Sequence, residues 1–120
     1  MKAPRTLTLL GSTGSIGTQA EQVLLAHPDA FAVRAISAAG SDPAQLARQA
    51  VALRAEQVAV ARDDVVDVLR STITELAGPG GRAPEILAGP EAAVEVAGNG
   101  ADVVLNGITG SIGLRPTLAA

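Results

Sequence analysis

The chain has 120 residues, of which 48% are hydrophobic and 13 are glycine, a composition typical of one globular domain with its own core. It contains no cysteine, which excludes disulfides, a thiolate nucleophile and a cysteine metal site, and its net charge of −3 argues against a nucleic-acid-binding surface. Neither a signal peptide nor an apolar run long enough to cross a bilayer is evident, so we expect a cytoplasmic protein with no membrane partner.

The first predicted unit is a strand, a glycine-rich turn and a helix between positions 7 and 28. Glycines at positions 11, 14 and 17 follow the apolar run. Gly11 would allow a sharp exit from the strand, Gly14 a close approach of a pyrophosphate, and Gly17 close packing of helix on strand. The helix dipole would favour the anion, and hydroxyls of the turn would add donors (Ser12, Thr13, Ser15). The alternative is a glycine turn that only packs a helix on a sheet.

The apolar residues of this first helix predict which side of it is buried. Helical spacing places them on one side, away from its polar residues: Ile16, Ala20, Val23, Leu24 and Ala26.

A second strand is predicted over 31–37, and the loop after it is informative about the cofactor. An acid at the tip of this strand would bind the ribose 2′-hydroxyl of NAD, but no acid occurs before Asp42. The small, uncharged tip leaves room for the 2′-phosphate of NADP, although no Arg or Lys is adjacent in the sequence. Asp42 followed by Pro43 is more simply explained as an N-cap and first residue of the next helix.

Further elements alternate along the chain. Helices are predicted over 43–54, 63–76 and 90–97, and strands over 57–61, 85–88 and 101–106. In the second of these helices Asp63 and Asp64 suit the N-terminus, and the expected buried stripe consists of Val65, Val68, Leu69 and Ile73.

The pentapeptide TGSIG occurs twice, at 13–17 and 109–113, each time after a strand and at the start of a helix. In a doubly wound sheet ordered 3-2-1-4, two such turns would line one cleft at the point where strand order reverses. We therefore predict an α/β fold with a doubly wound parallel sheet, Rossmann-like and three-layered. Such a fold needs further strands, so we expect it to be incomplete at the C-terminus and the chain to be the front part of a longer enzyme.

Three segments together resemble the N-terminal NADPH-binding domain of the 1-deoxy-D-xylulose 5-phosphate reductoisomerase family. They are LTLLGSTGSIGTQ, HPDAFAVRAISAAGSD and ADVVLNGITGSIGLRPTLAA. The resemblance implies one NADP-binding domain over 1–120, with the catalytic, metal-binding and C-terminal domains absent. It also implies a family reaction that isomerises and reduces a phosphorylated sugar with NADPH and a divalent metal (Mg, Mn or Co) in non-mevalonate isoprenoid biosynthesis, usually by a homodimer. This chain alone is expected to bind cofactor without turnover.

The resemblance also assigns site residues. The phosphate-binding turn that begins at Gly11 falls on Thr13, Gly14, Ser15 and Ile16, and the adenosine-side loop falls on Gly40, Ser41 and Asp42. No catalytic or metal-binding residue is assigned, because the family's acids lie beyond the last strand-to-helix turn.

Two other classes of protein stay open on the sequence. One is the cofactor domain of another dinucleotide enzyme, such as a short-chain dehydrogenase/epimerase or a semialdehyde dehydrogenase. The absence of tyrosine and cysteine from this chain speaks against both. The other is a stand-alone nucleotide-binding module.

Overall fold

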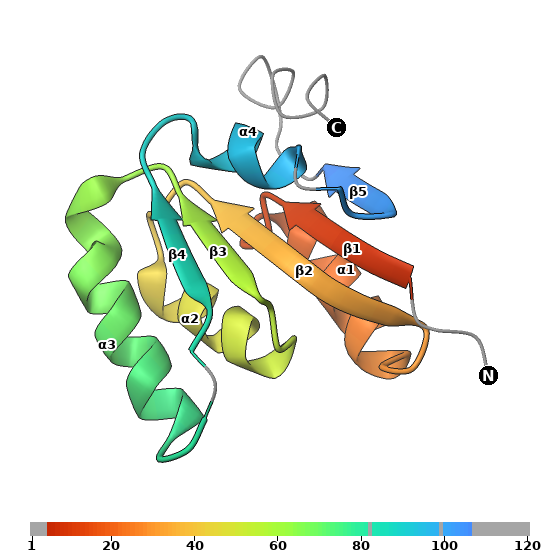
Figure 1. Cartoon of the computed structure of the whole chain (residues 1–120), viewed down its shortest axis with the longest axis horizontal. Helices are drawn as coiled ribbons and strands as arrows, with labels where there is room; N and C mark the ends of the chain where they lie inside the picture. Colours follow the sequence, from red (N-terminus) through yellow and green to blue (C-terminus); the bar gives the residue numbers. More distant parts are fainter. Residues whose placement is uncertain (1–4, 82, 99, 107–120) are drawn as a thin grey trace.

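The computed structural model describes residues 5–81, 83–98 and 100–106 (Figure 1). Strands and helices alternate along this part of the chain, as the sequence predicts. In chain order they are β1 Arg5–Leu10, α1 Ser15–Ala26, β2 Phe31–Ala38, α2 Pro43–Ala52, β3 Gln57–Val60, the short 3₁₀ helix η1 Asp63–Val65, α3 Val66–Ala77, β4 Glu85–Ala88, α4 Ala92–Ala97 and β5 Val103–Asn106.

The strands form one parallel sheet in the order β4-β3-β2-β1-β5. The chain first moves outward from β1 to β4 and then returns to the other side of β1, where β5 pairs with it. The reversal of strand order between β1 and β5 confirms the predicted doubly wound arrangement. The one addition is β4, which extends the sheet beyond β3.

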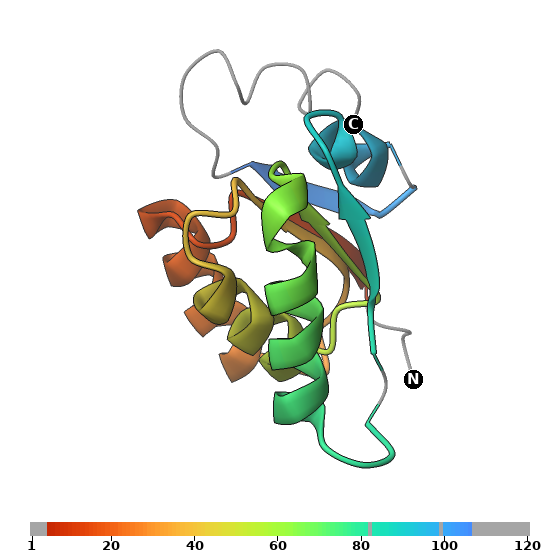
Figure 2. The same ribbon diagram turned by 90° about the vertical axis from the view of Figure 1, so that its left-hand side faces the viewer.

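Helices cover both faces of the sheet, so the fold has three layers (Figure 2). Because parallel crossovers are right-handed, the outward-moving connections place α1, α2 and α3 on one face, and the returning connection places α4 on the other. Successive side chains of a strand point to opposite faces of the sheet, and the two cores divide accordingly. Leu7 and Leu9 belong to the core beneath α1–α3, whereas Leu10 packs with Val96 of α4. The chain therefore has the predicted Rossmann-like α/β architecture.

The burial of α1 differs from the predicted apolar side. Ile16 and Val23 are 55% and 57% exposed, whereas Gly17 and Leu24 are buried and Ala20 is half-buried. The helix is rotated so that its smallest residue, Gly17, lies against the turn that follows β1. The close approach of the α1 backbone to the backbone of the turn decides which side of the helix is buried, and the larger side chains of Ile16 and Val23 stay exposed.

Two further expectations about burial were wrong. Val68 of α3 is 54% exposed, although its neighbours Leu69 and Ile73 are in the core. In β5, which is expected to be a buried strand, Leu105 is 39% exposed, because β5 pairs on one side only within the described residues. The second glycine turn at 107–113 and the helix expected after it lie outside the described residues.

Candidate functional site

The glycine turn after β1 is tied to the end of the neighbouring strand. Ser12 donates its backbone N–H to the carbonyl oxygen of Ser37 at 2.8 Å, and Gly11 donates its own to the Ser37 hydroxyl at 3.3 Å. Gly11 has φ of 70°, a conformation that favours glycine, and accepts a hydrogen bond from the Gly14 N–H at 3.2 Å. The turn is therefore compact and held at the carboxyl ends of β1 and β2.

The turn leads directly into the N-terminus of α1. Gly14 is the N-cap, with extended backbone (φ −76°, ψ 175°) and no side-chain hydrogen bond to the first turn. The first amides of a helix have no intrahelical partner, and they carry the positive end of its dipole. Gly14 and Ile16, at this end of the helix, are exposed, so a ligand can approach the helix terminus. This is the geometry of an anion-binding helix terminus.

Gly17 is required by the packing of α1 against the turn. A Cβ atom at this position would lie 2.3 Å from the carbonyl oxygen of Gly11 and 2.5 Å from that of Ser12, both backbone atoms. No larger residue fits unless the helix moves away from the turn. The third glycine therefore has the role that its spacing predicts.

A buried glutamine on α2 forms a hydrogen bond to the backbone of the turn. The sequence alone did not predict a role for this residue. Gln49, only 2% exposed, donates its Nε2 to the carbonyl oxygen of Ser12 at 2.7 Å and to Oε1 of Glu21 at 3.1 Å. It lies on the same side of α2 as the core residues Leu46 and Ala50. A polar residue on an otherwise apolar helix face was the signal that could have identified it.

The loop after β2 lies next to the glycine turn, because Leu10 and Ser37 are register partners in adjacent strands. Gly40 is buried with φ of 108°, and Ser41 and Asp42 are exposed. The Asp42 carboxylate accepts a hydrogen bond from the Gln45 N–H at 3.1 Å and caps α2. The predicted N-cap is confirmed.

The side chains of the glycine turn differ in their access to a ligand. Thr13 is half-buried and Ile16 is exposed. Ser12, by contrast, is fully buried beneath the turn, so the expectation that its hydroxyl donates to a bound phosphate was wrong for this conformation. An anion above the turn would therefore meet the first amides of α1 rather than that hydroxyl.

One ion pair lies at the same edge of the sheet. Arg62, just after β3, donates from Nε and Nη2 to the two carboxylate oxygens of Asp64 at 3.0 and 2.6 Å. This hydrogen bonding by the guanidinium holds the pKa of the Asp64 carboxyl below its ordinary value. Both side chains are more than half exposed.

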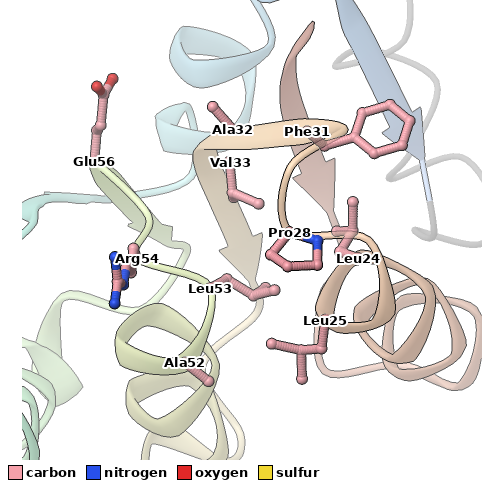
Figure 3. A pocket seen from close by; sticks show the side chains of 10 residues that line it. All are labelled: Leu24, Leu25, Pro28, Phe31, Ala32, Val33, Ala52, Leu53, Arg54 and Glu56. Atoms are coloured by element: carbon pink, nitrogen blue, oxygen red, sulfur yellow. The ribbon is translucent and has the colours of Figure 1, made fainter. Parts of the chain in front are cut away.

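A cavity of about 500 Å³ lies at the opposite edge of the sheet (Figure 3). Its lining comes from the C-terminal ends of α1 and α2 and from the beginning of β2, and includes Leu24, Pro28, Phe31, Leu53 and Arg54. In a parallel α/β sheet ligands bind at the carboxyl ends of the strands. This cavity is therefore separate from the candidate nucleotide site.

The described residues hold no group of three or more His, Asp or Glu side chains that could bind a metal ion. Within the same part of the chain, no helix is long and apolar enough to cross a membrane.

Comparison with known proteins identifies close relatives. Residues 7–120 match the family model described as 1-deoxy-D-xylulose 5-phosphate reductoisomerase. The chain is 58% identical over 117 residues to the protein of that name from Streptomyces coelicolor, and 57% identical over 119 residues to that from Beutenbergia cavernae. These alignments cover 98% and 97% of this chain and 28% of each relative, so the chain spans less than a third of their length.

Comparison with solved structures also finds reductoisomerases. The reductoisomerase from Zymomonas mobilis in complex with NADPH superposes with a TM-score of 0.86 at 34% identity, over 98% of this chain and 29% of that one. A DOX-P reductoisomerase in complex with NADPH, fosmidomycin and magnesium gives 0.83 at 28% identity, over 96% of this chain and 27% of that one. The other dinucleotide enzymes and the stand-alone module left open by the sequence are not favoured by these matches.

Proposed function

Because the chain belongs to the 1-deoxy-D-xylulose 5-phosphate reductoisomerase family, we propose that it forms the NADPH-binding domain of such an enzyme. The observation that carries this proposal is the glycine turn between β1 and α1, which places the N-terminus of α1 and its first amides at the carboxyl edge of the sheet. The domain comprises residues 1–120, and it binds cofactor without completing the reaction.

The residues present fit NADPH at two points. The pyrophosphate lies over the turn, where Gly11 and Gly14 keep the backbone accessible, and the contacts come from Thr13, Gly14, Ser15 and Ile16. The adenosine ribose lies over the loop after β2, against Gly40, Ser41 and Asp42. When bound, NADPH supplies the hydride for the reduction, and the turn and loop orient it.

The whole enzyme, in this proposal, isomerises and reduces 1-deoxyxylulose 5-phosphate to 2-C-methylerythritol 4-phosphate. It acts as a cytoplasmic homodimer on a small phosphorylated sugar, in the non-mevalonate route to isoprenoids. A magnesium complex is among the similar structures. The described residues of this chain do not fit a divalent metal, since they contain no cluster of suitable ligands. We therefore assign no metal ligand and no catalytic residue here.

Thermal unfolding of the chain with NADPH, NADH and ATP in parallel tests the proposal. A ligand at about one hundred times its dissociation constant stabilises the folded state by about 2.7 kcal/mol, so NADPH should raise the midpoint clearly. We expect a smaller shift with NADH and little with ATP. A folded sample whose midpoint does not move with NADPH contradicts the assignment.

A further inference from the structure

The loop between β2 and α2, residues 39–42, contains no basic side chain. In a dinucleotide-binding fold this loop lies beside the adenosine ribose, whose 2′ position distinguishes NADPH from NADH. The charged side chain of the loop, Asp42, is a carboxylate and caps α2. It repels a phosphate dianion, so selection of NADPH by charge requires a cation from another element.

Arg62 is held against this loop from the end of β3. Strands β2 and β3 are paired in parallel up to Ala38 and Val60. Beyond them, Ala61 donates its N–H to the Ala38 carbonyl oxygen at 3.2 Å. A Cβ atom placed on Gly40 would lie 3.3 Å from Cβ and 3.4 Å from Cδ of Arg62. The aliphatic stem of Arg62 therefore covers Gly40, and its guanidinium emerges beside the loop.

The guanidinium is available to an anion. Within the described part of the chain it is paired with Asp64 through Nε and Nη2, which leaves its other N–H groups for a further acceptor. The arginine and aspartate side chains are 55% and 65% exposed, and an exposed ion pair of this kind contributes little stability and rearranges easily. A planar guanidinium also matches the oxygens of a phosphate in a two-point contact.

No other cation of the described residues lies at this edge of the sheet. The segments that follow the carboxyl ends of β1 to β4 are 11–14, 39–42, 61–62 and 89–91, and Arg62 is the one Lys or Arg among them. The sequence separates Arg62 from Gly40 by more than a whole helix, which is why the loop considered alone shows no basic partner.

We propose that Arg62 binds the 2′-phosphate of NADPH and makes the site selective against NADH. This proposal rests on the proposed function, because it concerns the adenosine end of the same cofactor site. Gly40 contributes by leaving room for the arginine stem over the loop.

Calorimetric titration of the chain and its Arg62→Gln variant with NADPH and NADH provides the test. We expect the variant to bind NADPH about 10- to 100-fold more weakly, the usual range for loss of a charge-assisted contact, while its affinity for NADH changes less than about twofold. Arg70→Gln is the matched control, because Arg70 is also exposed and lies 3.9 Å from an aspartate, Asp67, on α3. It should leave both affinities unchanged.

Two smaller ligands isolate the phosphate. Adenosine 2′,5′-bisphosphate carries the 2′-phosphate and ADP does not, so only the former should lose affinity in Arg62→Gln. Arg62→Lys retains the charge and should restore part of the discrimination. An unchanged ratio of NADPH to NADH affinity in Arg62→Gln overturns the proposal. An equal loss for both cofactors also overturns it, because that result indicates stacking on the adenine instead.

The wild-type titration separates this proposal from the one on which it rests. If the folded chain binds neither NADPH nor NADH, the cofactor assignment fails, and the role of Arg62 fails with it. If the wild type binds NADPH and Arg62→Gln keeps the same preference, the cofactor assignment stands and the role of Arg62 alone is rejected.

Discussion

Gln49 Nε2 lies 2.7 Å from the carbonyl oxygen of Ser12, so a buried amide on α2 holds the glycine turn from the side opposite its open face. The same nitrogen reaches the carboxylate of Glu21 on α1. One side chain thus joins the turn and both of the helices that pack beside it. Its role is to position the turn, since it is buried beneath it.

Replacement of Gln49 by Leu should therefore affect stability and binding together. The buried Ser12 carbonyl would lose this donor, which costs about 1–3 kcal/mol of unfolding free energy. Affinity for NADPH and NADH should fall by a similar factor, because the turn serves both. Urea denaturation and calorimetry measure the two effects. Gln45→Leu on the same helix is the control, and an equal effect there would contradict a specific role for Gln49.

Gly17→Ala should destabilise the fold although alanine favours helices. The new Cβ would meet the Gly11 carbonyl oxygen at 2.3 Å, so α1 must move away from the turn. Overpacking of this kind typically costs about 1–3 kcal/mol. Thermal unfolding should show a lower midpoint, whereas Gln19→Ala on the exposed side of α1 should not. A midpoint equal to that of the wild type would show that the helix adjusts without loss.

Gly14→Val should separate binding from folding. The backbone of Gly14 is extended, a conformation that valine adopts readily, and the residue is exposed, so the fold should tolerate the change. The branched side chain would occupy the space above the α1 amides, where the pyrophosphate is proposed to lie. We expect loss of both NADPH and NADH binding in a protein with an unchanged circular dichroism spectrum. Wild-type affinity in this variant would exclude the turn as the site.

Variants of Asp42 distinguish capping from cofactor contact. Asn caps helices about as well as Asp, whereas Ala does not, so Asp42→Ala should lose about 1 kcal/mol of stability and Asp42→Asn almost none. If Asp42 touches the cofactor only through its backbone, both variants should bind NADPH within about twofold of the wild type. A large loss of affinity in Asp42→Asn would instead assign the carboxylate itself to the ribose.

The sequence by itself determined the elements and the place of the site. Three local signals act within a few residues of the chain. They are the apolar run of β1, the spacing of glycines 11, 14 and 17, and the Asp42–Pro43 cap. They were sufficient to predict a parallel α/β fold and a turn between β1 and α1 that could bind phosphate, because strand, turn and helix are consecutive. Resemblance over three longer segments of the chain was sufficient for recognition of the family, which the matches to known proteins confirm.

Only the tertiary structure decided which residues meet across elements. Gly17 against the Gly11 carbonyl determined the buried side of α1, so that Ile16 and Val23 are exposed contrary to the pattern of apolar residues. Gln49 under Ser12 and Arg62 over Gly40 depend on strand order and on the direction of the crossovers. These last two contacts, of Gln49 with Ser12 and of Arg62 with Gly40, join positions more than twenty residues apart, and no local periodicity encodes them. The physical reason is that a parallel sheet brings the ends of successive strands to one edge, and with them side chains that the sequence keeps apart.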